Sequence, residues 1–200
     1  MGVVLAGGAG ARVGGADKGL LPLSGKPLVE HVLERLRPQC DRLLIVANRH
    51  LDEYAHYAPV VHDEGDGHTG PLAGLAAAFG FLEANRHALP RWMLSTPVDC
   101  PDLPGALALR LRAVLLENPR TGCAFVHRAG RPQPLSAMYR VGGNAAAWCA
   151  SAQTAWREHG SPMRWHAEIG AVAVHFDDAI DAFHNLNVPD DFRDYERSHG

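Results

Sequence analysis

The architecture of this 200-residue chain follows from the stretch GVVLAGGAGARVGGADK, residues 2–18. Its apolar start, residues 3–6, predicts a buried strand, which leads directly into a loop with five glycines between residues 7 and 17. Glycine lets backbone N–H groups turn toward an anion and lets a phosphate come close. Because Arg12 and Lys18 add two cations at the same rim, the stretch predicts a triphosphate-binding loop at the end of a strand.

The rest of the chain alternates short apolar runs with helical patterns. Strands are predicted at residues 43–47, 59–62, 92–95, 123–126, 135–139 and 171–176, and helices at 27–38, 71–85, 104–117, 143–159 and 189–197. This alternation predicts an α/β fold of three layers around a mostly parallel sheet. With no repeat, low-complexity tract or linker, residues 1–200 are expected to form a single domain. Ligands of such sheets bind outside the carboxyl ends of the strands.

Composition excludes several classes of protein. A content of 46% hydrophobic and 20% charged residues is typical of a globular domain, and a net charge of −3 without a basic run argues against nucleic-acid binding. The longest nearly apolar stretch, residues 70–82, is shorter than the roughly 20 residues of a membrane span, and the N-terminus lacks the basic start of a secretory signal. Four widely spaced cysteines, Cys40, Cys100, Cys123 and Cys149, indicate reduced thiols in a cytoplasmic protein.

The chain's two lysines lie close together. Of 19 basic residues only Lys18 and Lys26 are lysine, and both fall in the first 26 residues. A lysine ammonium is a compact point charge, whereas arginine presents a wide planar fork. The clustering therefore favours a phosphate-binding role, with chance as the alternative.

Known phosphate-binding motifs fit the loop poorly. The Gly-Lys pair at residues 25–26 is followed by Pro27, which excludes a Walker loop. The glycines at positions 8, 10 and 14 are spaced one residue too widely for a dinucleotide fingerprint. A surface loop without a ligand is the remaining alternative.

A fixed carboxylate is predicted near the middle of the chain. Asp99 follows the apolar run at 92–95 and lies between Pro97 and Pro101, which restrict the backbone on both sides. Mg²⁺ binds proteins through one or two carboxylates together with phosphate oxygens and water. Asp99 is therefore a candidate Mg²⁺ ligand, the alternative being that it caps the turn before the helix near Pro104.

Two further turns carry candidate side chains. Residues 62–68 alternate His, acidic residues and Gly without matching a zinc or calcium pattern, so most of this segment is expected to be a solvated loop. Asp63 is the exception, because it directly follows a strand. Near the end of the chain, Asn185 and Asn187 precede the last helix, where Asn187 either caps that helix or supplies a neutral oxygen to a metal or substrate.

Taken in order, these motifs resemble a known family. They are Leu5-Ala6-Gly7-Gly8 with Arg12, Gly14 and Asp17-Lys18, then Gly25-Lys26-Pro27, Ala47-Asn48-Arg49, Gly70-Pro71-Leu72-Ala73-Gly74, Pro97-Val98-Asp99-Cys100-Pro101 and Asn185-Leu186-Asn187-Val188-Pro189. The set is similar to that of the molybdenum cofactor guanylyltransferases, although the opening motif alone is shared with many nucleotidyltransferases. The resemblance implies a Rossmann-like fold of the nucleotide-diphospho-sugar transferase type. It also implies Mg²⁺-dependent transfer of GMP from GTP to the terminal phosphate of Mo-molybdopterin, with apo-molybdoenzymes or their chaperones as further partners.

The resemblance also implies roles for individual residues. The positions that match the family's nucleotide, phosphate and metal contacts are Leu5, Ala6 and Gly7 for the guanine nucleotide, Gly8 and Arg12 around the phosphates, Lys18 in the phosphate grip, Asp63 as a nucleotide-contacting carboxylate, Asp99 as the Mg²⁺ ligand, and Asn185 and Asn187 as a second metal or substrate contact. A nucleotide-binding Asn of some members is here Val46, which leaves Asn48, two residues on, as the candidate.

The implied chemistry needs no protein base. A phosphate monoester has its second pKa near 6 and is largely ionised at neutral pH, so positioning and charge neutralisation remain to be supplied, by Mg²⁺ on Asp99 and by Arg12 and Lys18. Arg131 and the Asn185–Asn187 turn are candidates for the molybdopterin side.

Three alternatives stay open. One is a CTP-dependent cytidylyltransferase. Another is an NAD(P)-dependent oxidoreductase, although residues 46–49 lack the acidic residue that would hold a ribose. The third is an adaptor that binds GTP without catalysis.

Overall fold

The computed structural model describes residues 1–7, 17–63, 70–88 and 90–199, and a single sheet lies at its centre. In this part of the chain the sheet has seven strands in the order β5-β4-β1-β6-β8-β7-β9. Their bounds are β1 Gly2–Leu5, β4 Leu43–Ala47, β5 Val60–His62, β6 Trp92–Pro97, β7 Cys123–Arg128, β8 Arg131–Arg140 and β9 Val172–His175. Only β8 runs against its neighbours β6 and β7, so the prediction of a mostly parallel sheet is confirmed.

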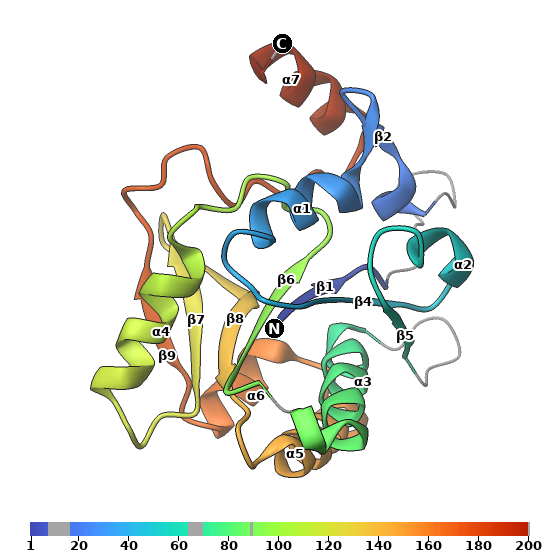
Figure 1. Cartoon of the computed structure of the whole chain (residues 1–200). Coiled ribbons are helices and arrows are strands. Elements are labelled where there is room, and N and C mark those ends of the chain that lie inside the picture. The colour runs from blue at the N-terminus through green and yellow to red at the C-terminus, as the bar shows by residue number, and fades with distance from the viewer. Residues whose placement is uncertain (8–16, 64–69, 89, 200) are drawn as a thin grey trace.

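Helices cover both faces of the sheet (Figure 1). The α-helices of the described residues are α1 Leu28–Leu36, α2 Leu51–Tyr54, α3 Pro71–Ala84, α4 Leu107–Glu117, α5 Ala145–Glu158, α6 Pro162–Glu168 and α7 Pro189–His199. Apolar side chains of α1 and α4 pack on one face, and those of α3, α5 and α6 pack on the other. These are the three layers that the alternation of patterns predicts.

Strand β1 does not alternate between polar and apolar residues, because both of its faces are buried. Val4 packs against the α1 and α4 side, whereas Val3 and Leu5 pack against the α3 and α5 side. All three are buried. A strand covered on both faces has apolar residues at every position, and this is the pattern that the first apolar run carries.

Three small elements were not predicted. The helices α2 and α6 have four and seven residues, too few for a helical stripe to stand out. The hairpin of β2 (Pro22–Leu23) and β3 (Lys26–Pro27) turns at Ser24 and Gly25, whose φ angles of 48° and 82° are those of a tight two-residue turn.

The strand register brings four strand ends to one edge of the sheet. Leu5 at the end of β1 pairs with Val46 and with Pro97, and Ala47 at the end of β4 pairs with His62. The segments after β1, β4, β5 and β6 therefore begin at the same edge, and they hold the predicted site residues Lys18, Asn48, Asp63 and Asp99.

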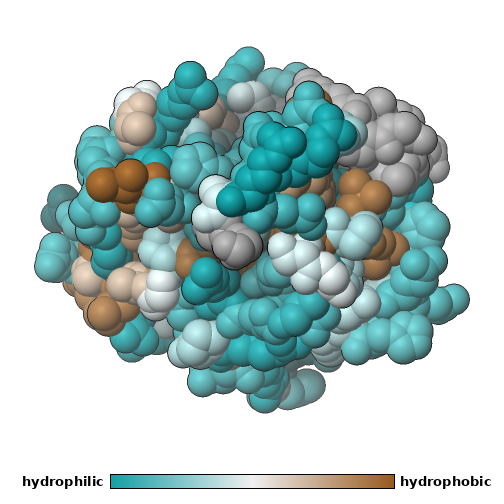
Figure 2. Space-filling model, turned by 90° about the horizontal axis from the view of Figure 1, so that it is seen from above, coloured by the Kyte–Doolittle hydropathy of each residue, from teal (hydrophilic) through white to brown (hydrophobic). Residues whose placement is uncertain are grey.

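The C-terminal helix packs beside the hairpin (Figure 1). Leu186 and Phe192 form a small apolar cluster with Leu23 and Leu28, and the backbone N–H of Ser24 donates to Glu196 Oε1 at 2.7 Å. The outer face around α7 is mostly hydrophilic (Figure 2). The last helix is thus joined to the start of the chain.

Two predictions about the class of protein can be compared with this structure. The four cysteines are free thiols, as expected. Among the described helices, none combines the length and apolar character that a membrane crossing requires.

A buried histidine lies in the core at the α6 side of the sheet. His166 Nε2 is 3.1 Å from the Tyr139 hydroxyl and 3.8 Å from Cys123 Sγ. Its Nδ1 is buried, and no described residue bonds it. Burial lowers the pKa of His166 from about 6.5 to about 4, so the folded protein holds this imidazole neutral.

We expect this histidine to make stability pH-dependent. Below pH 6.5 the unfolded chain takes up a proton at position 166 that the folded chain refuses until about pH 4. Stability from this group is therefore present above pH 6.5 and falls by up to roughly 3 kcal/mol between pH 6.5 and 4. Urea unfolding at several pH values should show a shallower decline for His166→Gln. An identical decline in both proteins would contradict the expectation.

Candidate active site

Three side chains from distant parts of the sequence meet at the carboxyl edge of the sheet. Lys18 Nζ donates to Asn187 Oδ1 at 2.9 Å and lies 3.3 Å from Asp99 Oδ2. Lys18 and Asp99 are about one-fifth exposed, so the group is accessible but largely enclosed. We call Lys18, Asp99 and Asn187 the cation cluster; all three are residues that the sequence singled out.

The backbone on both sides holds Asp99 in place. Val98 N donates to Leu5 O at 3.1 Å, which ties the turn to β1, and Leu186 N donates to Asp99 O at 2.8 Å. Among the described residues the Asp99 carboxylate bonds Lys18 through Oδ2, and no backbone N–H donates to its Oδ1, so the alternative that Asp99 caps the turn before the helix near Pro104 is wrong. Asp99 Oδ1 is buried, and no described group donates to it.

A buried tyrosine that the sequence did not reveal positions Lys18. The lysine opens a 3₁₀ turn, Lys18–Leu20, and Asp17 Oδ1 caps the turn by accepting from Gly19 N at 3.2 Å and from the Tyr54 hydroxyl. Tyr54 is fully buried, and burial, followed by the bond to Asp17, raises the pKa of its hydroxyl. The hydroxyl stays protonated and donates. Tyr54 comes from the short helix α2, whose polar sequence gave no signal.

A second group of predicted residues lies at the ends of β1, β4 and β5. Asp63 is buried, and a Cβ on Gly7 would lie 3.2 Å from Asp63 Oδ2 and 4.0 Å from Asn48 Nδ2. We call Gly7, Asn48 and Asp63 the strand-end cluster. The side chains of Leu5 and Ala6 are buried in the core beneath it, so a ligand could reach only their backbone.

The family's Asn position is part of the apolar core here. Val46 is buried on the α3 side, and a Cβ on Gly74 would lie 3.6 Å from Val46 Cγ1 and 3.3 Å from Leu5 Cδ2. Close packing of helix α3 on the sheet occupies this position. Asn48 stands two residues further along the chain, with its Nδ2 near Gly7.

Asn187 does not cap the last helix with its side chain. The carboxylate of Asp191 does so instead, because its Oδ2 accepts from the N–H groups of Asn187 and Val188. The capping interpretation of Asn187 is therefore wrong, and its carboxamide oxygen is bonded to Lys18.

Other predicted residues lie elsewhere. Lys26 is exposed and forms an ion pair with Glu34 at 2.6 Å, away from the cation cluster. Arg131 starts β8 opposite Arg128, and the side chain of Asn185 is exposed. In the described part of the structure Arg131 has no bond to the cation cluster, and Asn185 meets it only through its backbone oxygen, 3.5 Å from Asn187 Nδ2. Gly8 and Arg12 lie outside the described residues.

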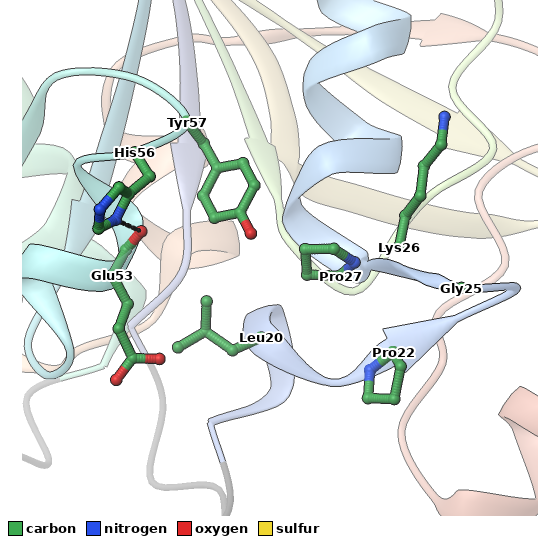
Figure 3. A pocket seen from close by; sticks show the side chains of 8 residues that line it. All are labelled: Leu20, Pro22, Gly25, Lys26, Pro27, Glu53, His56 and Tyr57. Atoms are coloured by element: carbon green, nitrogen blue, oxygen red, sulfur yellow. Dashed lines mark hydrogen bonds between the residues drawn. The ribbon is translucent and has the colours of Figure 1, made fainter.

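A pocket of about 340 Å³ adjoins the lysine turn (Figure 3). Leu20, the last residue of that turn, lines it together with Tyr57 and His56 after helix α2 and with Pro22 and Pro27 of the hairpin. The Lys26 side chain points away from its centre (Figure 3). The charged residues of its lining are Glu53 and Lys26.

The donor set suits a hard divalent cation with other ligands of its own. In the described residues there is no group of three or more His, Cys, Asp or Glu side chains that would form a closed metal site. The cation cluster offers one carboxylate and one amide oxygen. This matches Mg²⁺, which takes one or two carboxylates and completes its shell with phosphate oxygens and water.

Comparison with known proteins agrees with this geometry. A family model described as "MobA-like NTP transferase domain" matches residues 2–169. A molybdenum cofactor guanylyltransferase of Vibrio vulnificus is 37% identical over 198 residues, covering 96% of this chain and 93% of that protein. One from Shewanella loihica is 34% identical over 190 residues, covering 94% and 91%. The chain belongs to the molybdenum cofactor guanylyltransferase family.

Solved structures support the fold. The molybdopterin-guanine dinucleotide biosynthesis protein A of Archaeoglobus fulgidus is 25% identical with a TM-score of 0.75, covering 100% of this chain and 98% of that one. A CMP:2-keto-3-deoxy-manno-octonic acid synthetase complexed with CTP is 13% identical with a TM-score of 0.71, which shows the fold alone. The predicted nucleotide-diphospho-sugar transferase fold is confirmed.

Family membership decides the class of activity. The chain is a nucleotidyltransferase of molybdenum cofactor biosynthesis, and the oxidoreductase alternative is wrong. The family model ends at residue 169, whereas the cation cluster includes Asn187. The last part of the chain therefore contributes to the site from beyond the matched region.

We expect Gly19→Ala to disturb the lysine turn. A Cβ at this position would lie 2.3 Å from the Tyr54 hydroxyl and 3.0 Å from Val98 Cγ2, which the packed core cannot accommodate without displacing Tyr54. Overpacking of this kind costs about 1–3 kcal/mol, measurable by urea unfolding. Gly105→Ala is a matched control because a Cβ there meets nothing within 4 Å.

Adding Tyr54→Phe to Gly19→Ala removes the nearest clashing atom and should restore part of the lost stability. If Gly19→Ala alone is as stable as the control, the close approach of Gly19 to Tyr54 has no structural importance.

Proposed function

We propose that this protein transfers GMP from GTP to the terminal phosphate of Mo-molybdopterin, forming molybdopterin guanine dinucleotide and pyrophosphate with the aid of Mg²⁺. We further propose that residues 1–200 act as one domain. The observation that carries the proposal is the convergence of Lys18, Asp99 and Asn187 beside the strand-end cluster. Family membership supports it.

The reaction exchanges one phosphoanhydride bond for another. An oxygen of the terminal phosphate of molybdopterin attacks the α-phosphorus of GTP, and the bond from that phosphorus to the bridging oxygen of the β-phosphate breaks. Since the attacking monoester is already ionised at neutral pH, no side chain has to remove a proton. The cation cluster accordingly contains a cation, a carboxylate and an amide, and no histidine.

The two clusters divide the nucleotide between them. Asp63 is a buried carboxylate, suited to N–H or O–H donors of the nucleoside and repelling phosphates. Gly7 leaves room for the nucleotide to approach the backbone beside Asn48. Leu5 and Ala6 would contribute backbone atoms, and Gly8 and Arg12 are proposed around the phosphates.

At the other end, Lys18 grips the phosphates and stabilises the charge of the departing pyrophosphate. Asp99, whose Oδ1 has no donor among the described residues, would hold Mg²⁺ together with the amide oxygen of Asn187. When bound, Mg²⁺ neutralises charge on the phosphate oxygens. Lys18 meanwhile provides a positive charge that stays attached to the protein.

The direct test is pyrophosphate release from each of the four nucleoside triphosphates with Mg²⁺ and Mo-molybdopterin. We expect release with GTP. Release with CTP instead would identify a cytidylyltransferase, and GTP binding without release would identify an adaptor. Either result would overturn the proposed reaction.

Asp99→Asn should abolish transfer while leaving the fold intact. The substitution keeps the shape of the side chain but removes the charge that holds Mg²⁺, and losing such stabilisation costs about 10³-fold in rate. Because the Lys18–Asp99 pair is about four-fifths buried, the substitution should also lower stability, and urea unfolding should show that the variant remains folded.

Asp41→Asn is the control for Asp99→Asn. Asp41 is an exposed carboxylate at the amino end of β4, the opposite edge of the sheet. The Asp41→Asn variant should transfer GMP at the wild-type rate. Wild-type turnover by Asp99→Asn would remove the metal assignment.

Lys18 variants should have opposite effects on metal and nucleotide binding. In the ligand-free protein the Lys18 ammonium already sits between Asp99 Oδ2 and Asn187 Oδ1, the oxygens offered to a metal. Lys18→Met should therefore bind Mn²⁺ alone more tightly, as followed by paramagnetic resonance of free Mn²⁺, yet bind GTP more weakly by calorimetry. Lys18→Arg, which keeps the charge but not the compact shape, should also weaken GTP binding and slow transfer. Unchanged Mn²⁺ and GTP affinities in both variants would contradict the assignment of Lys18.

A further inference from the structure

The segment that brings Asn187 to the cation cluster is held at several points. We call residues 182–197 the C-terminal arm. Phe183 N donates to Asp102 O at 3.1 Å, and Leu186 N donates to Asp99 O at 2.8 Å. The Tyr195 hydroxyl donates to Asp102 Oδ1 at 2.9 Å. Together with the cluster that buries Leu186 and Phe192, these bonds fix the arm against the Asp99 turn and the hairpin.

The carboxylate of Asp191 bonds the backbone at Asn187. Asp191 Oδ2 accepts from Asn187 N at 2.5 Å and from Val188 N at 2.9 Å. Asp191 is the third residue of α7, and a carboxylate there that reaches back to the N–H before the helix is half of a capping box. The helix dipole favours its negative charge at this end.

Asn187 is therefore held on both sides. The bond from Leu186 to Asp99 fixes the backbone before it, and Asp191 fixes its own N–H and the next one. Its side chain has a single close partner within the described residues, Lys18 at 2.9 Å, because the bond from its Nδ2 to Asn185 O is long at 3.5 Å. The direction of the carboxamide oxygen is thus set by the backbone and hence by Asp191.

We propose that Asp191 is a positioning residue of this enzyme: by bonding the backbone of Asn187 and Val188 it aims the Asn187 carboxamide oxygen at the Lys18 ammonium and at the ligands that bind there. This inference rests on the proposed function for its consequence in catalysis. The arm's other anchors do not involve Asp191, so its removal should loosen Asn187 without detaching α7.

The central test compares Asp191→Ala with Asp190→Ala. Asp190 is the neighbouring exposed carboxylate of the same helix turn, and its bond is to Arg193 on the surface. Asp191→Ala should lower kcat/KM for GTP roughly tenfold, the size of one ordinary hydrogen bond, whereas Asp190→Ala should behave as wild type. Asp191→Glu should recover activity, because Glu is the usual capping-box residue at this position.

A double-mutant cycle separates positioning from stability. If Asp191 acts through Asn187, adding Asp191→Ala to Asn187→Ala should cost nothing further in kcat/KM. Additive losses would overturn the proposal, since they would show that Asp191 serves the helix alone. Should Asp191→Ala fail to fold, Asp191→Leu, which keeps a side chain of similar shape but has no acceptor oxygen, takes its place in the cycle.

A measurement without substrate keeps this inference apart from the proposed function. In the ligand-free protein, Asp191→Ala should shift the side-chain amide resonances of Asn187 in a ¹⁵N spectrum, and Asp190→Ala should leave them in place. Unshifted resonances in Asp191→Ala overturn the inference whatever the activity. A shift in a protein that transfers no GMP supports the positioning role and refutes the proposed function instead.

Discussion

The candidate site depends on one ammonium group that joins three segments of the chain. Lys18 Nζ bonds to side chains 81 and 169 residues further along, at Asp99 and Asn187. A half-buried carboxylate without a partner is costly, and in the ligand-free protein Lys18 compensates Asp99. In the proposed reaction, Mg²⁺ would balance the charge of Asp99 and the phosphates of the nucleotide would balance that of Lys18. The same ion pair would thus stabilise the folded site and supply the charges that the substrate meets.

The parallel sheet makes this arrangement possible. Because β1, β4, β5 and β6 end in register, the residues that follow them come together at one edge although they lie far apart in the sequence. The two clusters differ in charge: the strand-end cluster holds the buried carboxylate of Asp63, whereas in the cation cluster the ammonium of Lys18 balances the carboxylate of Asp99. A nucleotide has an uncharged, donor-bearing end and an anionic end, so this difference favours one orientation of the ligand along the edge.

The sequence predicted what periodicity and strong motifs encode. Continuous apolar runs gave the strands, the stripes of α1 and α3 gave their helices, and the two prolines located Asp99 at a strand end. Tyr54 could not be found, because α2 has four residues and its tyrosine acts through a buried bond to Asp17 that only tertiary structure creates. The capping alternative for Asn187 was wrong for a related reason. Asp191, a residue with no distinctive spacing, already fills that role. Lys26 lies near Lys18 in the sequence but not in the structure, where it pairs with Glu34 away from the cation cluster.

The C-terminal arm explains why the site needs residues beyond the region that the family model matches. The segments after β1 and β6 bring Lys18 and Asp99 to the carboxyl edge of the sheet, and the arm adds Asn187. The arm is fixed to the same turn as the Asp99 carboxylate, through Leu186 at Asp99 and Phe183 at Asp102. A shift of the arm would therefore change the position of Asn187 relative to Asp99. Helix α7 is in addition bonded to the hairpin through Glu196. That hairpin begins just after the lysine turn. A displacement of the lysine turn, the Asp99 turn or the C-terminal arm should therefore displace the other two segments.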